Sequence, residues 1–196
     1  MHLLPGFLSL DQQRRLLTQI QGILERAPLF SPAMPRSGSP YLVRMSNCGS
    51  HGWLSDRSGY RYSPVHPLTG APWPEIPRSV LELWHTTTGL AYAPQACLIN
   101  YYGAAAKLGL HRDQDEEARD APILSISLGD TAVFRLGGPE RKSPTRSLRL
   151  GSGDLLILSG PSRHWFHGVD RILPSTSQLL PKGGRINLTL RRVTPP

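Results

Sequence analysis

Three side chains of this sequence have the types and spacing of a non-haem Fe(II) centre. His111 and Asp113 are two positions apart, and such residues project from the same face of a strand, with Arg112 pointing away. His167 follows later, soon after the apolar run 155–158. Two histidines and one carboxylate on one face of an octahedral ion leave three positions open, which suits a co-substrate and O2. A lone His-x-Asp triplet is more often a polar pair in a loop, so the hypothesis depends on the rest of the set.

The end of the chain alternates polar and apolar residues with a period of two, which predicts a β-strand. Its odd-numbered positions are Arg185, Asn187, Thr189 and Arg191. This polar face has two interpretations: a face in contact with solvent, or the lining of an anion site. A solvated face usually mixes lysine, glutamate and serine, whereas a guanidinium presents a planar fork that matches a carboxylate. The residue types favour the second interpretation and a dicarboxylate co-substrate.

A second polar pair lies on the predicted strand 96–102. Asn100 and Tyr102 share a face of this strand by parity, and an amide and a phenol are neutral donors for carboxylate oxygens in a buried pocket. The alternative is a strand end that enters the turn at 103–105, and these two residues alone do not separate the two interpretations.

These residues and their neighbours resemble the AlkB family of nucleic-acid dealkylases, and most of all its bacterial DNA-repair branch. The resemblance extends over residues 40 to 193, whereas the first forty residues carry no motif of the family and look shortened or diverged. The segments that carry the resemblance are 100–103, 108–116, 121–130 and 185–191, with further matches at 45–49, 52–53, 60–64 and 72–74.

The resemblance implies an iron centre held by His111, Asp113 and His167. His164 is the competing ligand, because only one of two histidines three positions apart on a strand can face the other two ligands. The family pattern of a histidine followed by a glycine favours His167, which precedes Gly168. The acidic cluster that we expect to frame the metal-site loop consists of Asp113, Asp115, Glu116 and Glu117.

The resemblance also implies a pocket for 2-oxoglutarate. Arg185 and Tyr102 would hold the distal carboxylate, and Arg191 with Asn100 would lie near the carboxylate next to the keto group. The residues that would support this pocket are Asn187 and Thr189.

For the substrate, the resemblance implies an extruded base that Trp53 would stack upon, on the side opposite His111. Asp115 would face the exocyclic amine of that base. Tyr60 would lie on a nucleotide-recognition lid and touch the backbone or sugar. The alternative for Trp53 is ordinary packing within the lid.

The implied activity is oxidative demethylation of N-alkylated nucleobases, such as 1-methyladenine and 3-methylcytosine, in DNA and, as a further candidate, RNA. Fe(II), 2-oxoglutarate and O2 would hydroxylate the alkyl carbon, with release of formaldehyde, succinate and CO2. One alternative is a 2-oxoglutarate-dependent oxygenase that acts on a protein or small molecule, and another is a jelly-roll binding module that has lost its metal. The complete ligand set disfavours the binding module, while Trp53, Tyr60 and the basic charge favour a nucleic acid.

Composition agrees with alkylated DNA or RNA as the partner. The chain has 22 Lys and Arg against 14 Asp and Glu, a formal net charge of +8 and a pI near 10.1. A basic protein from a GC-rich genome would have a similar composition. Candidate phosphate contacts are Arg36, Arg44, Arg57, Arg61, Arg141, Lys142 and Arg146.

Other features of the sequence indicate a cytoplasmic monomer without a membrane partner. No run of 18 apolar residues is present, and the N-terminus lacks the basic and apolar regions of a secretory signal. Two cysteines, Cys48 and Cys97, are too few for a disulfide framework, and we expect both to be reduced thiols.

The hydrophobic pattern predicts an α+β protein that is mainly β, with N-terminal helices that buttress a β-sandwich. The family resemblance makes this sandwich a double-stranded β-helix, or jelly roll. One helix is predicted from a capping box at Ser9 to about Arg26, and another from Pro77 to about Thr88.

We expect one oxygenase domain over residues 1–196. It would contain an N-terminal helix and connection in 1–40, a nucleotide-recognition lid in 41–75 and a catalytic jelly-roll core in 95–193. The strands predicted for this core are 96–102, 122–128, 131–136, 146–150, 154–159, 164–167 and 185–193.

Overall fold

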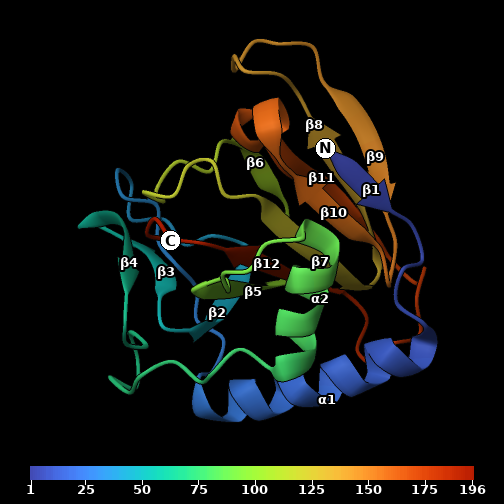
Figure 1. The fold of residues 1–196 in the computed structure, drawn as a ribbon, viewed down its shortest axis with the longest axis horizontal. Coiled ribbons are helices and arrows are strands. Elements are labelled where there is room, and N and C mark those ends of the chain that lie inside the picture. The colour runs from blue at the N-terminus through green and yellow to red at the C-terminus, as the bar shows by residue number, and fades with distance from the viewer.

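The computed structural model describes all 196 residues, and its regular structure is mainly β (Figure 1). The N-terminal elements are β1 (His2–Leu4), α1 (Leu10–Arg26), β2 (Arg44–Gly49), β3 (Gly52–Asp56), β4 (Gly59–Ser63) and α2 (Arg78–Thr88). The remaining elements are β5 (Ala96–Tyr102), β6 (Leu108–His111), β7 (Ile123–Gly129), β8 (Thr131–Leu136), β9 (Arg146–Leu150), β10 (Leu155–Leu158), a 3-10 helix (Gly160–His164), β11 (His167–Leu173) and β12 (Arg185–Arg191).

The strands form two antiparallel sheets and a separate hairpin. The larger sheet has six strands in the order β1-β10-β7-β12-β5-β2, and the smaller has four in the order β6-β11-β8-β9. Strands that pair in space are distant along the chain, as β7 and β12 are, which is typical of a jelly roll. The predicted fold class, mainly β with a jelly roll buttressed by helices, is confirmed.

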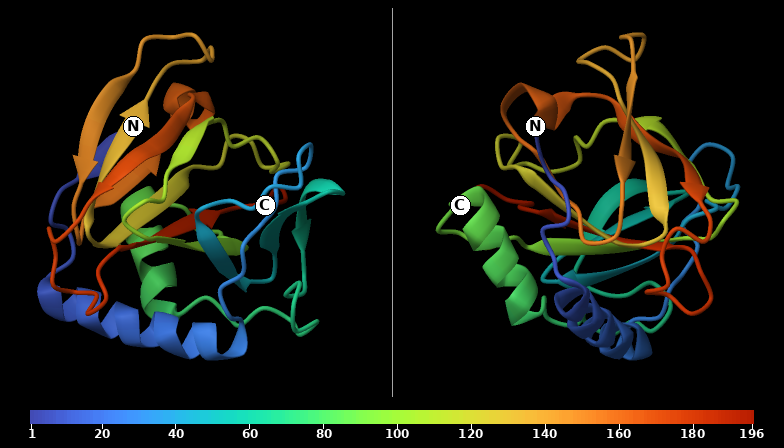
Figure 2. Two further views of the ribbon diagram at one scale, coloured as in Figure 1. Left: turned by 180° about the vertical axis from the view of Figure 1, so that it is seen from behind. Right: turned by 90° about the vertical axis from the view of Figure 1, so that its right-hand side faces the viewer.

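Both helices cover the outer face of the six-stranded sheet (Figures 1 and 2). Ile20 of α1 and Trp84 of α2 are fully buried in one apolar cluster with Leu188 of β12. The N-terminus of α1 has the predicted capping box, in which Ser9 and Gln12 each satisfy a backbone N–H of the other. Neither helix is long and apolar enough to cross a membrane.

A second apolar cluster fills the space between the two sheets. It includes Leu98 and Leu156 from the larger sheet and Phe134 and Val169 from the smaller one. Towards one end of the sandwich this cluster gives way to a cavity of about 540 Å³, and the same four side chains form part of the cavity wall. The sandwich core therefore continues directly into the lining of the cavity.

Strand β12 lies at the centre of the larger sheet, between β5 and β7. All seven of its residues are buried, although every second side chain is polar or charged. The apolar side chains face the helices, and the polar ones line the cavity. The predicted period-2 strand is confirmed, and the interpretation of its polar face as solvated is wrong.

The segment before the second histidine departs from the prediction. We expected a strand at 164–167, but residues Gly160–His164 form a 3-10 helix and β11 begins at His167. Pro161 lies in the first turn of this helix, where its fixed φ favours a helical start. His164 therefore ends the 3-10 helix, and the strand that carries His167 extends to Leu173, much further than predicted.

Two other parts of the chain were not foreseen in detail. Strand β1 pairs with β10 at the edge of the larger sheet, although residues 1–40 carry no motif. The β3–β4 hairpin stands beside the edge strand β2, at the left of Figure 1, and Trp53 is opposite Tyr62 in its register. This hairpin lies within the segment 41–75, for which a lid role stays a prediction.

Candidate active site

The predicted metal ligands meet at one end of the sandwich. His111 at the end of β6 and His167 at the start of β11 are register partners across the two strands. Nε2 of His111 lies 3.8 Å from Oδ1 of Asp113, and Nε2 of His167 lies 3.5 Å from Oδ2 of the same carboxylate. The ligand atoms of all three residues lie within 4.8 Å of one another. Adjacent ligands of an ion with bonds of about 2.1 Å are about 3 Å apart, so a small contraction would complete the site.

The premise of a single strand for His111 and Asp113 needs a correction. Strand β6 ends at His111, and Asp113 lies in the loop that follows. Arg163 holds this loop in place, because its guanidinium donates hydrogen bonds to the main-chain carbonyls of Asp113 and Ala121 at 2.9 and 2.8 Å. The carboxylate therefore reaches the histidines through a clamped loop and not through strand parity.

The close approach of β6 and β11 requires a glycine beside the second histidine. A Cβ at Gly168 would lie 2.6 Å from the carbonyl oxygen of Leu108 and 2.9 Å from that of Gly109. Any side chain at this position would push the two strands apart and separate His111 from His167. This is a physical reason for the histidine–glycine pair that the sequence shows.

Both imidazoles are oriented to offer Nε2 to a metal. Nδ1 of His111 lies 2.9 Å from the carbonyl oxygen of Gly109, and Nδ1 of His167 lies 2.9 Å from that of Trp165. A carbonyl oxygen only accepts hydrogen bonds, so Nδ1 carries the proton and Nε2 keeps its lone pair. Oδ2 of Asp113 is buried without a hydrogen-bond partner. Three unshared electron pairs thus converge on one point, and this donor set fits Fe(II).

The imidazole of His111 should make the stability of the metal-free protein depend on pH. Burial and the neighbouring His167 lower the pKa of His111 to about 4, from an ordinary value of 6.5. Between these values the unfolded chain binds a proton that the folded chain does not, so stability falls as pH drops from 6.5 towards 4. We expect the melting temperature of the metal-free protein to fall over this window, and to fall less in His111→Gln. Equal slopes for the two proteins would exclude His111 as the source.

Arg185 is a buried cation that has no carboxylate partner in the protein. Its side chain is 2% exposed, its Nη2 donates to the Ser127 hydroxyl at 2.8 Å, and its Nε has no partner. Burial lowers the pKa of Arg185 to about 10, an effect that Tyr102 and Asp154 partly oppose. An unpaired buried charge is costly, so the site is complementary to an anion. Tyr102, its register partner on β5, supplies a phenol beside the same guanidinium.

Arg191, at the other end of the polar face, is paired with the metal site. Its Nη2 lies 2.9 Å from Oδ1 of Asp113, and its Nη1 lies 3.3 Å from Oε1 of Glu116. Burial opposes ionisation of Asp113, but the guanidinium of Arg191 outweighs it and holds the pKa of that carboxyl well below its usual range. The Nε of Arg191 is buried without a partner. This guanidinium therefore keeps one donor for a further acceptor.

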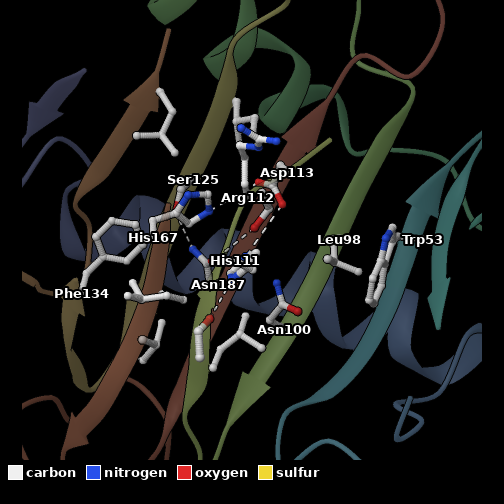
Figure 3. Close-up of a pocket in the computed structure, with 18 of the residues that line it drawn as sticks. Trp53, Leu98, Asn100, His111, Arg112, Asp113, Ser125, Phe134, His167 and Asn187 are labelled. Carbon is white, nitrogen blue, oxygen red and sulfur yellow. Dashed lines mark hydrogen bonds and ion pairs between the residues drawn. The ribbon is translucent and has the colours of Figure 1, made fainter. Parts of the chain in front are cut away.

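The polar residues between the two arginines form a connected set (Figure 3). Asn187 donates to the Ser125 hydroxyl at 2.7 Å and to the carbonyl of Ile126 at 3.0 Å, and it accepts from Thr189 at 3.0 Å. Asn100 is the register partner of Asn187, and its amide oxygen is buried without a partner. These contacts fix the cavity floor between Arg185 and Arg191.

Trp53 lies across the cavity from the histidines and the aspartate (Figure 3). Its indole N–H donates to Oδ2 of Asp115 at 2.9 Å. Its ring stacks on that of Tyr60, with centroids 5.7 Å apart and planes inclined by 19°. Tyr60 thus covers part of the indole, and Asp115 already accepts one hydrogen bond from the β3–β4 hairpin.

All twelve residues predicted to contact the metal, the co-substrate or the base line this one cavity. They are Trp53, Tyr60, Asn100, Tyr102, His111, Asp113, Asp115, His167, Arg185, Asn187, Thr189 and Arg191. The contacts of Tyr62, Glu116 and Arg163 were not foreseen. Glu116 gave a signal through the acidic cluster, whereas Tyr62 had only its place in a matching segment and Arg163 had no signal.

Comparison with known proteins identifies the family. Residues 1–191 match the model of the 2OG-Fe(II) oxygenase superfamily. The chain is 54% identical over 188 residues to the alpha-ketoglutarate-dependent dioxygenase AlkB homolog of Caulobacter vibrioides, an alignment that covers 96% of this chain and 85% of the relative. It is 39% identical to AlkB of Escherichia coli, with 94% and 86% covered. The chain belongs to the AlkB family.

More distant members of the AlkB family agree with this result. The solved structure of OsALKBH1 matches with a TM-score of 0.79 at 32% identity, covering 97% of this chain and 95% of that one. The DNA N(6)-methyladenine demethylase ALKBH1C of Arabidopsis thaliana is 28% identical over 98% of this chain, which spans 48% of the relative. This AlkB-family protein is an Fe(II)- and 2-oxoglutarate-dependent dioxygenase, as its ligand set and unpaired Arg185 indicate.

Proposed function

We propose that this enzyme oxidatively demethylates N-alkylated nucleobases in DNA, with RNA as a second substrate. The observation that carries the proposal is the cavity itself, in which an aromatic side chain of the β3–β4 hairpin faces the metal ligands. Trp53 and His111 line opposite sides of it, and Asp115 lies at the edge of Trp53. A volume of about 540 Å³ accommodates a co-substrate together with a base.

The side chains of the site have separable tasks in this proposal. His111, Asp113 and His167 would hold Fe(II). When bound, Fe(II) with 2-oxoglutarate and O2 supplies the oxidant for hydroxylation of a C–H bond, with succinate and CO2 as products. Arg185 with Tyr102 would bind the distal carboxylate of 2-oxoglutarate, and Arg191 with Asn100 the carboxylate next to its keto group. Asn187 and Thr189 would orient these groups.

The hydroxylated methyl group needs no further catalyst from the protein. A hydroxymethyl group on a ring nitrogen is a hemiaminal, which breaks its C–N bond and releases formaldehyde. The protein therefore has to place the alkyl carbon near the metal ligands and exclude water. The apolar side chains of Leu98, Phe134 and Leu156 line the cavity, and this apolar surface helps to exclude water.

A base within a duplex cannot reach ligands at the end of a sandwich, so it has to be extruded or presented in a single strand. Methylation of a Watson–Crick nitrogen weakens pairing and lowers the cost of extrusion. Many such lesions are cationic, and the indole face of Trp53 with the carboxylate of Asp115 is complementary to a cation.

The cavity lining also includes two basic side chains that lie near one aromatic ring. The guanidinium carbons of Arg112 and Arg141 lie 5.5 and 5.8 Å from the ring centroid of Phe166. Both arginines line the cavity and are exposed, so they are available to phosphates. Of the phosphate contacts predicted from the sequence, which include Arg141 but not Arg112, Arg61 is already paired with Asp56 at 2.6 Å. This pairing weakens its case as a phosphate contact.

Trp53→Ala should separate substrate binding from co-substrate turnover. Loss of a stacking platform should weaken binding of a methylated oligonucleotide by about 1–3 kcal/mol. Substrate-free conversion of 2-oxoglutarate to succinate should continue, because the metal and co-substrate lie on other residues. The measurements are oligonucleotide affinity and succinate formation in the same preparation.

The control for this variant is Leu68→Ala, which removes an exposed apolar side chain of segment 41–75 that does not line the cavity. If affinity and succinate formation fall together in Trp53→Ala, Trp53 supports the fold. If neither changes, a protein or small-molecule substrate becomes the better hypothesis.

Formaldehyde release from a panel of methylated DNA and RNA oligonucleotides, with and without Fe(II) and 2-oxoglutarate, tests the function directly. Cytoplasmic location and a monomeric state stay predictions.

A further inference from the structure

A chain of buried charges links the metal loop to the β3–β4 hairpin. Oε2 of Glu116 pairs with Arg163 at 3.0 Å, and Oε1 of Glu116 lies 3.3 Å from Nη1 of Arg191. The side chain of Glu116 is completely buried, and that of Arg163 is 2% exposed. The Tyr62 hydroxyl, from β4, donates to the same Oε1 of Glu116. The hairpin is therefore hydrogen-bonded to a charged group in the interior.

Tyr62 also contacts the arginine that faces the co-substrate pocket. Its hydroxyl oxygen accepts from Nη1 of Arg191 at 3.3 Å. The same guanidinium pairs with the metal ligand Asp113, and its Nε has no partner. One hydroxyl thus lies between a fixed carboxylate and a guanidinium that has a free donor for a ligand.

The acceptor of this contact cannot easily follow a movement of the hairpin. The guanidinium of Arg163 donates to Glu116 and also to the main-chain carbonyls of Asp113 and Ala121, so the carboxylate of Glu116 is held in place. Breaking the contact removes a hydrogen bond to a buried carboxylate, which is costly. Trp53 is the register partner of Tyr62, so the position of the Tyr62 hydroxyl also determines where the indole lies.

We propose that Tyr62 is a positioning residue that couples the lid hairpin to the co-substrate pocket through Glu116 and Arg191. A carboxylate bound to Nε of Arg191 fixes the guanidinium, which strengthens its contact with Tyr62 and holds the hairpin over the cavity. Coupling between two sites is reciprocal, so a nucleic acid that holds the hairpin also strengthens binding of 2-oxoglutarate. The placement of a base on Trp53 rests on the proposed function, whereas the coupling of the hairpin to 2-oxoglutarate does not.

The test is amide hydrogen exchange of the β3–β4 hairpin in anaerobic Fe(II)-loaded protein, with and without 2-oxoglutarate. The quantity compared is the exchange rate of the hairpin relative to that of β7 and β12, which corrects for any change in global stability. In the parent protein, 2-oxoglutarate should slow exchange of the hairpin. In Tyr62→Phe the hairpin should exchange roughly tenfold or more faster, as expected for loss of a hydrogen bond to a charged group. The response to 2-oxoglutarate should be lost.

Two further variants isolate the contact. Glu116→Gln keeps the shape of the acceptor but removes its charge, so Tyr62→Phe should have a smaller effect in that background. Glu117→Gln makes the same change at the exposed neighbouring residue and should behave as the parent protein. In steady-state kinetics, Tyr62→Phe should raise the KM for oligonucleotide.

The possible results are distinguishable. Unchanged hairpin exchange in Tyr62→Phe overturns the proposal. Faster exchange with an intact response to 2-oxoglutarate means that the hydroxyl only supports the hairpin, and this also overturns the coupling. A lost response to 2-oxoglutarate, in an enzyme that does not demethylate any oligonucleotide, supports the coupling while the proposed function fails.

Discussion

Asp113→Ala should reduce turnover of 2-oxoglutarate below detection and weaken Fe(II) binding. Asp113 is the one anionic ligand, and its carboxylate lies 3.8 and 3.5 Å from the two imidazoles that complete the set. The variant also removes the partner that lies 2.9 Å from Arg191, so the charge of that guanidinium loses its nearest compensation. Anaerobic Fe(II) titration and succinate formation measure the two effects.

The carboxylate has a structural task as well, so a second substitution is needed. Asp113→Asn keeps the size of the side chain but not its charge, and it should also lose metal affinity and turnover. Asp120→Asn changes an exposed carboxylate of the same loop region and should leave both unchanged. Full activity in Asp113→Asn together with Asp113→Ala would exclude Asp113 as a ligand.

Arg185→Leu should weaken binding of 2-oxoglutarate without unfolding the protein. A buried carboxylate that loses a charged hydrogen-bond partner loses roughly 1.5–3 kcal/mol, or about 10- to 150-fold in affinity. Because Arg185 has no carboxylate partner within the protein, an apolar replacement removes an uncompensated buried charge. The melting temperature of the co-substrate-free protein should therefore stay the same or rise.

Weaker binding of 2-oxoglutarate without a loss of thermal stability would be specific to a role of Arg185 in co-substrate binding. Calorimetric titration of 2-oxoglutarate into the Fe(II)-loaded protein without O2 measures affinity, and thermal unfolding measures stability. Arg149→Leu removes an exposed guanidinium from β9 and serves as the matched control. An unchanged affinity for 2-oxoglutarate would reject the role of Arg185, and a large fall in melting temperature would show that its charge is structural.

Much of the site could be predicted because its residues follow strand periodicity. Arg185 and Arg191 belong to one strand whose parity places them on the same face, and Asn100 and Tyr102 belong to its neighbour. Parity requires only that a strand forms, and the sequence indicates strands well where apolar and polar residues alternate. The helices were equally accessible, since Ser9 and Pro77 mark their starts.

The contacts between distant segments could not be predicted in the same way. The pairing of Arg163 with Glu116 joins a 3-10 helix to a loop, and no local pattern encodes which arginine meets which carboxylate. The prediction of a strand at 164–167 failed because the apolar residues before His167 were taken as continuous with it. The stacking of Trp53 on Tyr60 depends on the pairing register of β3 and β4. The sequence indicates a turn between these strands but not their register.

The central position of β12 has a consequence for how the chain folds. Shifting this strand by one residue against β5 and β7 would exchange its two faces. Arg185 and Arg191 would then be pressed into the apolar layer beneath the helices, while Leu188 and Leu190 would enter the cavity. The misregistered strand would bury two cations in hydrocarbon, so such a state is strongly disfavoured. The side chains that we predict to bind the co-substrate thus also disfavour a misaligned sheet as the protein folds.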